Sequence, residues 1–219
     1  MRKSRLSADE RRLQILKNAR RVFAAHGYQG TRTRDIAKGC RINESTIYAH
    51  FKNKEDLFMS VLNDLHNEIQ AVGREALSLE ADALTTVRSV ICLLWERFAS
   101  DPDLPRVLTH AFAMSMHHGG FRKVFGQRLA GHHAYLRVQL ERGMEDGNLR
   151  PDLDPDEFAA LILGLGIAYA LLKAAGVIKS LGVSDPLPLF EIVVGGMLAQ
   201  PGKSEEQGAA PDEVGGTPD

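Results

Sequence analysis

Two short helical segments near the N-terminus are separated by only four residues. Thr31 can cap a helix that runs through the apolar pair Ile36–Ala37. Asn43 can cap a second helix, in which Ile47 and Phe51 lie one turn apart on one face. Two short helices joined by so tight a turn form a helix-turn-helix, whose second helix fits the major groove of DNA.

Longer helices are predicted on both sides of this pair. Ser7–Glu10 has the spacing of a capping box, so a helix is expected over residues 8–26. Gly27 follows as a residue able to end it in a left-handed conformation. Asn53–Asp56 repeats the capping-box spacing and predicts a long fourth helix.

The remainder of the chain also carries helical periodicity, and no convincing strand pattern is present. Helices are expected at about 80–99, 104–117, 121–146, 155–175 and 187–199, with prolines at the breaks. The longest apolar run, Phe158–Leu172, has 15 residues, short of the roughly 20 that span a bilayer. It predicts a buried helix and no membrane contact.

Charge is distributed unevenly along the chain. Residues 1–57 hold 14 Lys and Arg against 6 Asp and Glu, a net charge of +8, and the remainder holds 13 against 22, a net charge of −9. A basic front suggests that this end meets a polyanion, although a solvated basic face is the simpler alternative. Cys40 and Cys92 cannot form a disulfide framework, and the polar N-terminus lacks the apolar run of a secretory signal, so a cytoplasmic location is expected.

The front of the chain resembles the TetR-type transcriptional regulators. The matching positions are Phe23, Gly27, Thr31, "RDIAKGC" (Arg34–Cys40), Ile42, "STIYAHF" (Ser45–Phe51) and "KNKEDL" (Lys52–Leu57). The resemblance implies an all-α, usually dimeric protein that commonly represses transcription and is released from DNA by a small molecule. No cofactor is expected for this protein.

The resemblance also divides the chain. It implies an N-terminal three-helix DNA-binding domain over 8–57, with the helix-turn-helix at about 32–51. A C-terminal helical domain over 58–200 would bind an effector and dimerise. Residues 201–219 are rich in Gly, Pro and acidic residues, which predicts a disordered tail.

Two residues depart from the family pattern. Arg41 stands in the turn where the family often has Gly, so it must adopt an unfavourable positive φ or shift the turn. Ser45 stands where the recognition helix often starts with Gly or Pro. Both departures bear on the angle of the recognition helix.

The resemblance assigns DNA contacts by position. Phosphate contacts are expected from Thr31, Thr33, Tyr48 and Lys54, and base contacts from Arg34, Glu44, Ser45, Ala49 and His50, with Thr46 near the edge of the helix. Glu44 carries two interpretations. Its carboxylate can accept a hydrogen bond from cytosine N4, or it is a solvated acid favoured by the helix dipole.

Two further sets of residues belong to the C-terminal helices. The family's ligand pocket corresponds to Trp95, Phe98, His110, Phe112, Met114, Met116, His117 and Tyr135, which would suit a largely apolar ligand, although such a stripe can be core. The dimer interface is expected on helix faces with small residues, namely Ala160, Gly164, Ala168 and Leu171, then Leu189, Ile192, Val193, Gly196 and Met197; these faces could also be intramolecular core.

Metal sites and other classes of protein find less support. Adjacent histidines on a helix point about 100° apart, so His117–His118 and His132–His133 are expected to be solvated or core-edge residues and no metal site is predicted. A helical enzyme would need a nucleophile, base or phosphate cradle at recognisable spacing, and none is present. A protein that coats DNA without sequence preference would carry basic charge throughout the chain.

Overall fold

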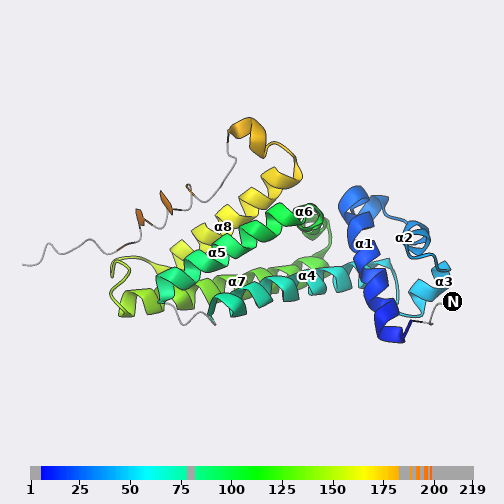
Figure 1. Ribbon diagram of the computed structural model, residues 1–219, viewed down its shortest axis with the longest axis horizontal. Coiled ribbons are helices and arrows are strands. Elements are labelled where there is room, and N and C mark those ends of the chain that lie inside the picture. Colours follow the sequence, from blue (N-terminus) through cyan, green and yellow to red (C-terminus); the bar gives the residue numbers. More distant parts are fainter. Residues whose placement is uncertain are drawn as a thin grey trace, which may run out of the picture.

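The computed structural model describes residues 6–77 and 82–182, together with Pro188, Glu191, Ile192, Gly195, Gly196 and Leu198. Within this part of the chain the elements are α1 (Ala8–Gly30), α2 (Thr33–Cys40), α3 (Glu44–Tyr48), α4 (Lys54–Leu77), α5 (Ala83–Ser100), α6 (Asp103–His117), α7 (Gly119–Glu145), α8 (Pro155–Ala174) and the 3₁₀ turn η1 (Ile178–Leu181). The all-α fold is therefore confirmed (Figure 1).

The capping box at the start of α1 is confirmed. Glu10 N–H donates to Ser7 Oγ at 3.2 Å, and Ser7 N–H donates to the Glu10 carboxylate at 2.7 Å. Gly27 interrupts the helix with φ 68° and ψ 177°, and one further turn follows it up to Gly30. The helix is thus broken where the sequence predicts, but the chain resumes helical geometry.

The predicted cap of α2 is wrong, and so is the predicted extent of α3. The residue before α2 is Arg32, while the Thr31 hydroxyl donates to the Gly27 carbonyl at 2.6 Å and so seals the end of α1. α3 ends at Tyr48, and Phe51 lies beyond it, 2% exposed. Phe51 still anchors this region, because the short turn after α3 directs its ring into the core.

The later helices begin and end within a few residues of the predicted limits. Asp82 and Asp154 cap α5 and α8 by accepting hydrogen bonds from backbone N–H groups of the first turn. The predicted helix over 187–199 falls largely outside the described residues; Pro188, Glu191, Ile192, Gly195 and Gly196 within it are helical. The predicted tail over 201–219 lies outside the described residues.

A cluster of buried side chains joins the N-terminal helices to the bundle. α1 packs against α4 and α6, and α4 continues from the N-terminal helices into the bundle formed by α5 to α8 (Figure 1). Phe23, Phe58, Val107 and Phe121 belong to a single cluster of buried side chains. The predicted domain boundary at 57/58 therefore falls inside α4 and within a shared core.

Ion pairs reinforce this junction. Arg20 of α1 pairs with Glu68 of α4 at 2.8 Å and with Asp101 after α5. Glu68 also pairs with Arg97 of α5. Because Arg20 is largely buried, these contacts hold α1 against the bundle more firmly than exposed pairs would.

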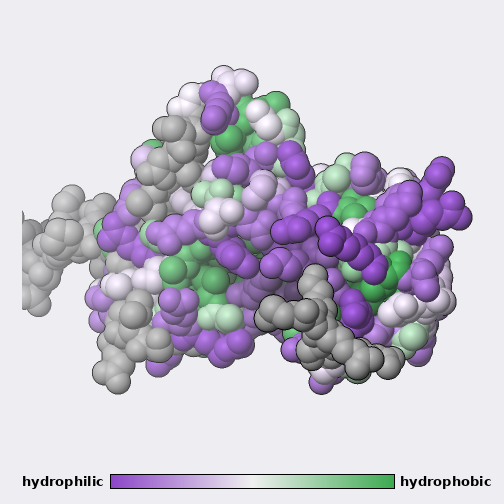
Figure 2. Space-filling model, turned by 45° about the vertical axis from the view of Figure 1, so that its right-hand side comes forward, coloured by the Kyte–Doolittle hydropathy of each residue, from purple (hydrophilic) through white to green (hydrophobic). Residues whose placement is uncertain are grey.

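α8 differs from the buried helix that its apolar sequence predicts. Only Ala159, Ile162 and Ala170 of α8 are buried, while Leu161, Leu171 and Leu172 are exposed. Figure 2 shows apolar side chains on the lobe at the top of the view, formed by the end of α8 and η1. α8 is long and apolar enough to cross a membrane, yet it packs against α6 and α7.

Candidate nucleic-acid interface and ligand cavity

The turn of the helix-turn-helix places Arg41 in the left-handed region, with φ 56° and ψ 46°. Arg41 N–H donates to the Lys38 carbonyl at 3.0 Å and Ile42 N–H donates to the Ala37 carbonyl at 3.1 Å. This is the hydrogen-bond pattern of a Schellman motif, which usually has Gly at the left-handed position. The turn is therefore kept without glycine, at a cost in backbone strain.

α3 has a buried face and an open face. Ile47 is 1% exposed and fixes the helix to the core, whereas Tyr48 is 48% exposed. Ser45 and Ala49 are also exposed, and Thr46 and His50 are half-buried. This is the division that the spacing of Ile47 and Phe51 predicts. α3 lies at the end of the molecule away from the bundle (Figure 1).

Thr33 connects α2 to both ends of α3. Its hydroxyl donates to the Glu44 carboxylate and lies 3.1 Å from the Tyr48 hydroxyl. With its proton committed to Glu44, Thr33 Oγ1 accepts from Tyr48. The hydroxyls of Thr33 and Tyr48 are therefore engaged within the protein in the absence of DNA, and a phosphate contact requires Tyr48 to exchange one partner for another.

Lys54 has a second role that the sequence does not reveal. Its ammonium donates to the carbonyls of Tyr28 at 2.9 Å and Thr31 at 3.1 Å. It also lies 4.5 Å from the centre of the Tyr28 ring. Since an ammonium has three N–H donors, one is left for a phosphate oxygen.

Thr31 is a correction among the expected phosphate contacts. Its side chain is 2% exposed, and its hydroxyl is occupied by the Gly27 carbonyl. It cannot reach DNA without breaking the end of α1. Arg34, by contrast, is exposed on α2, the helix before the turn.

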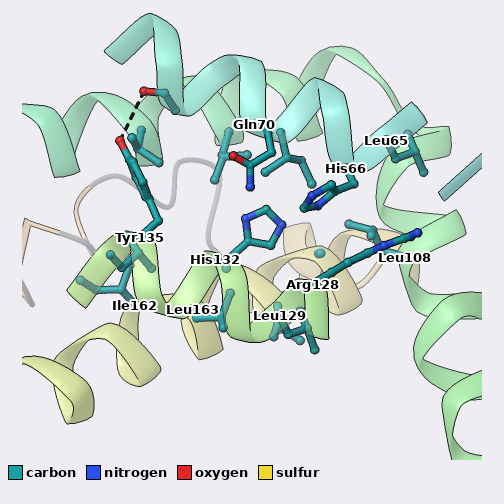
Figure 3. Close-up of a pocket in the computed structure, with 18 of the residues that line it drawn as sticks. Leu65, His66, Gln70, Leu108, Arg128, Leu129, His132, Tyr135, Ile162 and Leu163 are labelled. Atoms are coloured by element: carbon teal, nitrogen blue, oxygen red, sulfur yellow. Dashed lines mark hydrogen bonds between the residues drawn. The ribbon is translucent and has the colours of Figure 1, made fainter. Parts of the chain in front are cut away.

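A cavity of about 440 Å³ lies inside the helical bundle. Four of the predicted pocket residues line it, namely Trp95, Phe98, Phe112 and Tyr135. The wall comes from α4, α5, α6, α7 and α8, and most of it is Leu, Ile, Val and aromatic side chains (Figure 3). A largely apolar enclosure of this size is typical of a small-molecule site.

The other predicted pocket residues lie elsewhere. His110, Met114 and His117 line a smaller cavity of about 330 Å³, against His26 and Gly27 of α1. Met116 is 65% exposed. The reason is helical geometry: Leu108 and Phe112 occupy the face of α6 toward the bundle, and residues two positions away along α6 point to another face.

Four polar residues of the large cavity, His66, Gln70, Arg128 and His132, were not predicted. The rings of His66 and His132 are 5.0 Å apart. Burial and the neighbouring His66 lower the pKa of His132 to about 4. Burial and Arg128 also lower the pKa of His66. Their spacing, four residues apart on α4 and on α7, was the signal in the sequence.

The two members of the His132–His133 pair lie in different surroundings. His132 lines the cavity, whereas His133 Nε2 lies 2.9 Å from the Asp156 carbonyl. Within the described residues no group of three or more His, Cys, Asp or Glu side chains is placed to hold a metal ion. Cys40 is buried, and burial raises the pKa of its thiol. A buried thiol of this kind packs as a small apolar residue.

The described residues that were predicted for a dimer interface are exposed to solvent in the single chain. Ala160, Gly164, Ala168 and Leu171 of α8 are exposed, as are Ile192 and Gly196. A side chain added at Gly164 would meet nothing within 4 Å. The predicted Leu189, Val193 and Met197 lie outside the described residues.

Comparison with known proteins identifies relatives of this arrangement. The model of bacterial regulatory proteins of the tetR family matches residues 15–61. The HTH-type transcriptional repressor NicS of Pseudomonas putida is 31% identical over 154 residues, 67% of this chain and 69% of NicS.

Two solved structures share the fold. FadR from Bacillus subtilis in complex with stearoyl-CoA is 23% identical, with a TM-score of 0.67 over 84% of this chain and 95% of that one. A tetR-family protein from Rhodococcus RHA1 is 22% identical, with a TM-score of 0.71 over 90% and 100%.

Proposed function

The chain belongs to the TetR family and is a DNA-binding transcriptional regulator, and we propose that it is a repressor that binds a near-palindromic operator as a homodimer and is released by a small, largely apolar ligand. The observation that carries the proposal is the pairing of an outward-facing α3 with a ligand-sized cavity in the same molecule. The name of NicS, a repressor, supports the sign of regulation.

The proposed DNA surface follows from exposure and charge. The net charge of +8 over residues 1–57 supports contact with a polyanion. Arg34 can bridge guanine O6 and N7, and Ala49 can pack on a thymine methyl group. The remaining proposed contacts are Ser45, Thr46, Tyr48, His50 and Lys54. The Thr33 side chain is not among them, because it is 7% exposed and its hydroxyl donates to Glu44.

The proposed dimer uses the exposed apolar face of α8. One recognition helix spans too few base pairs for genomic specificity, so two copies related by a two-fold axis would read two half-sites. Leu161 and Leu171 are 45% and 38% exposed on a helix that is otherwise almost entirely apolar. Such a face gains free energy when a second copy removes it from water.

The proposed effector site is the large cavity. The name of the FadR relative records a complex with stearoyl-CoA, and that supports an apolar chain as part of the ligand. Phe112 of α6 lines the cavity, while the opposite side of α6 packs against α1. A ligand that displaces α6 would therefore also displace α1, and with it the DNA-binding helices.

Selection of bound duplexes from a random pool tests the DNA-binding part. The selected sequences should be near-palindromes, and affinity for them should exceed that for random duplexes at every salt concentration. Arg34→Ala should relax preference at one base pair in each half-site, and Lys38→Ala, an exposed charge on the same helix, serves as the matched control. Equal affinity for selected and random duplexes would instead support a non-specific DNA-binding protein.

A further inference from the structure

The charged side chains that line the large cavity are all positive. Among the described residues that line it, the formally charged side chains are Arg74 and Arg128, and no Asp or Glu is present. Arg74 is exposed and already solvated, whereas Arg128 is half-buried. The wall therefore favours an anion, and Arg128 is the cation that would gain most from one.

Arg128 shares the wall of the cavity with three neutral polar residues. His66 and Gln70 lie one turn apart on α4, and Arg128 and His132 lie one turn apart on α7. Figure 3 shows the rings of His66 and His132 next to each other, in the edge-to-face arrangement, with Gln70 nearby. We call these four residues the head-group cluster.

The head-group cluster has hydrogen-bonding capacity that the protein does not use. His66 Nδ1 is buried and has no hydrogen-bond partner. Arg128 donates to the Asn63 side chain, which is neutral, and makes no ion pair with any described residue. Burial lowers the pKa of Arg128. A buried ring nitrogen without a partner costs free energy, which a ligand with a polar head group would recover.

We propose that the ligand of this cavity is an apolar molecule with a single carboxylate, which binds the head-group cluster while the apolar body lies against the surrounding Leu, Ile and aromatic side chains. This inference rests on the proposed function of the cavity as the effector site. A carboxylate matches the guanidinium fork of Arg128 and leaves an oxygen for an imidazole N–H. A second charged group placed away from Arg128 and Arg74 would lie against apolar side chains, where nothing compensates its desolvation.

Trp95 supplies the measurement, because it is the only tryptophan of the chain and lines the cavity. Quenching of its fluorescence can follow titration with decanoate and with 1-decanol, which have the same chain but differ in the head group. The full-length protein should bind decanoate at least about tenfold tighter than decanol, as expected for charge-assisted hydrogen bonds in a buried site.

Arg128→Met should reduce the preference for decanoate over decanol to about one. Lys123→Met is the matched control, since Lys123 is an exposed cation on the same helix, and it should keep the preference. Retained binding of decanol by Arg128→Met shows that this variant is folded with an intact cavity. If Arg128→Met does not fold, His66→Phe supplies the same comparison through loss of one imidazole donor.

Three results would overturn the inference. These are equal or tighter binding of decanol by the wild-type protein, a decanoate preference that survives Arg128→Met, and absence of binding throughout the acids from hexanoate to tetradecanoate. Operator release is measured separately. Decanoate that binds as expected but leaves the operator complex intact would refute the effector role alone, and release by decanol alone would refute the carboxylate while the effector role stands.

Discussion

The Thr33 hydroxyl donates a hydrogen bond to the Glu44 carboxylate, which joins the first turn of α2 to the first turn of α3. Neither sequence interpretation of Glu44 included an internal partner. The bond explains how a carboxylate is held at the start of the helix proposed to meet DNA, because Thr33 and the helix dipole both favour it. One carboxylate oxygen remains for a base or for water.

Glu44→Gln keeps an oxygen acceptor for Thr33 and removes the negative charge. We expect affinity for all duplexes to rise about threefold at low salt and less at high salt, because repulsion from the phosphates is lost and is screened by salt. Fluorescence anisotropy with selected and random duplexes measures this change. Glu96→Gln, an exposed acid on α5, should leave affinity unchanged. A variant that instead loses preference at one base pair would show that Glu44 reads cytosine.

Local patterns predicted most of the fold, because helix limits depend on nearby residues. Ser7 with Glu10 marked the start of α1, and Gly27 marked its break. For Arg41 the resemblance left two outcomes, a positive φ or a shifted turn, because the family often has Gly there; the structure has the positive φ.

Contacts between distant segments could not be predicted from local sequence patterns. Thr33 meets Glu44 only because the turn folds α2 back on α3, and His66 meets His132 only because α4 packs near α7, with 65 residues between the two histidines in the sequence. The face of α6 that carries His110 was wrongly assigned to the pocket, because periodicity gives the faces of a helix but not which neighbour each face meets. The Thr31 hydroxyl was misassigned for the same reason.

Lys54→Met should weaken the fold as well as DNA binding. Loss of the ammonium leaves the Tyr28 and Thr31 carbonyls without their donor, at an expected cost of about 1 to 3 kcal/mol in the free energy of unfolding. Urea unfolding followed by circular dichroism measures this cost. Lys52→Met removes an exposed cation nearby and should leave the midpoint unchanged. An unaltered midpoint for Lys54→Met would restrict Lys54 to phosphate binding.

Arg41→Gly should stabilise the free protein by about 0.5 to 1 kcal/mol, because glycine adopts the left-handed conformation without steric strain. The gain is partly offset by the greater flexibility of glycine in the unfolded chain. Arg41→Ala removes the charge but keeps a Cβ atom, so it should give no gain. Equal stabilities of the two variants would mean that the side chain of Arg41, and not its backbone, determines the cost.

Acid should destabilise the protein through His132. Its pKa of about 4 in the folded state lies below the usual value of 6.5, so the unfolded chain binds the proton first as the pH falls. Stability present above pH 6.5 is therefore lost between about pH 6.5 and 4, by up to about 3 kcal/mol. Thermal unfolding across this range should show a shallower loss for His132→Gln. His133→Gln should behave as wild type, and identical slopes for all three proteins would contradict the assignment.

Leu171→Arg should convert the proposed dimer to a folded monomer. In a two-fold interface each substitution occurs twice, so two guanidinium groups would be buried against apolar side chains without partners. Light scattering after size-exclusion chromatography should give the mass of one chain, and circular dichroism should show unchanged helicity. Affinity for a near-palindrome should fall by roughly tenfold or more, because only one half-site is held at a time. Leu13→Arg is the matched control, since Leu13 is 61% exposed on α1 and lies outside the proposed interface. If Leu171→Arg remains dimeric, the exposed face of α8 is not where two copies meet.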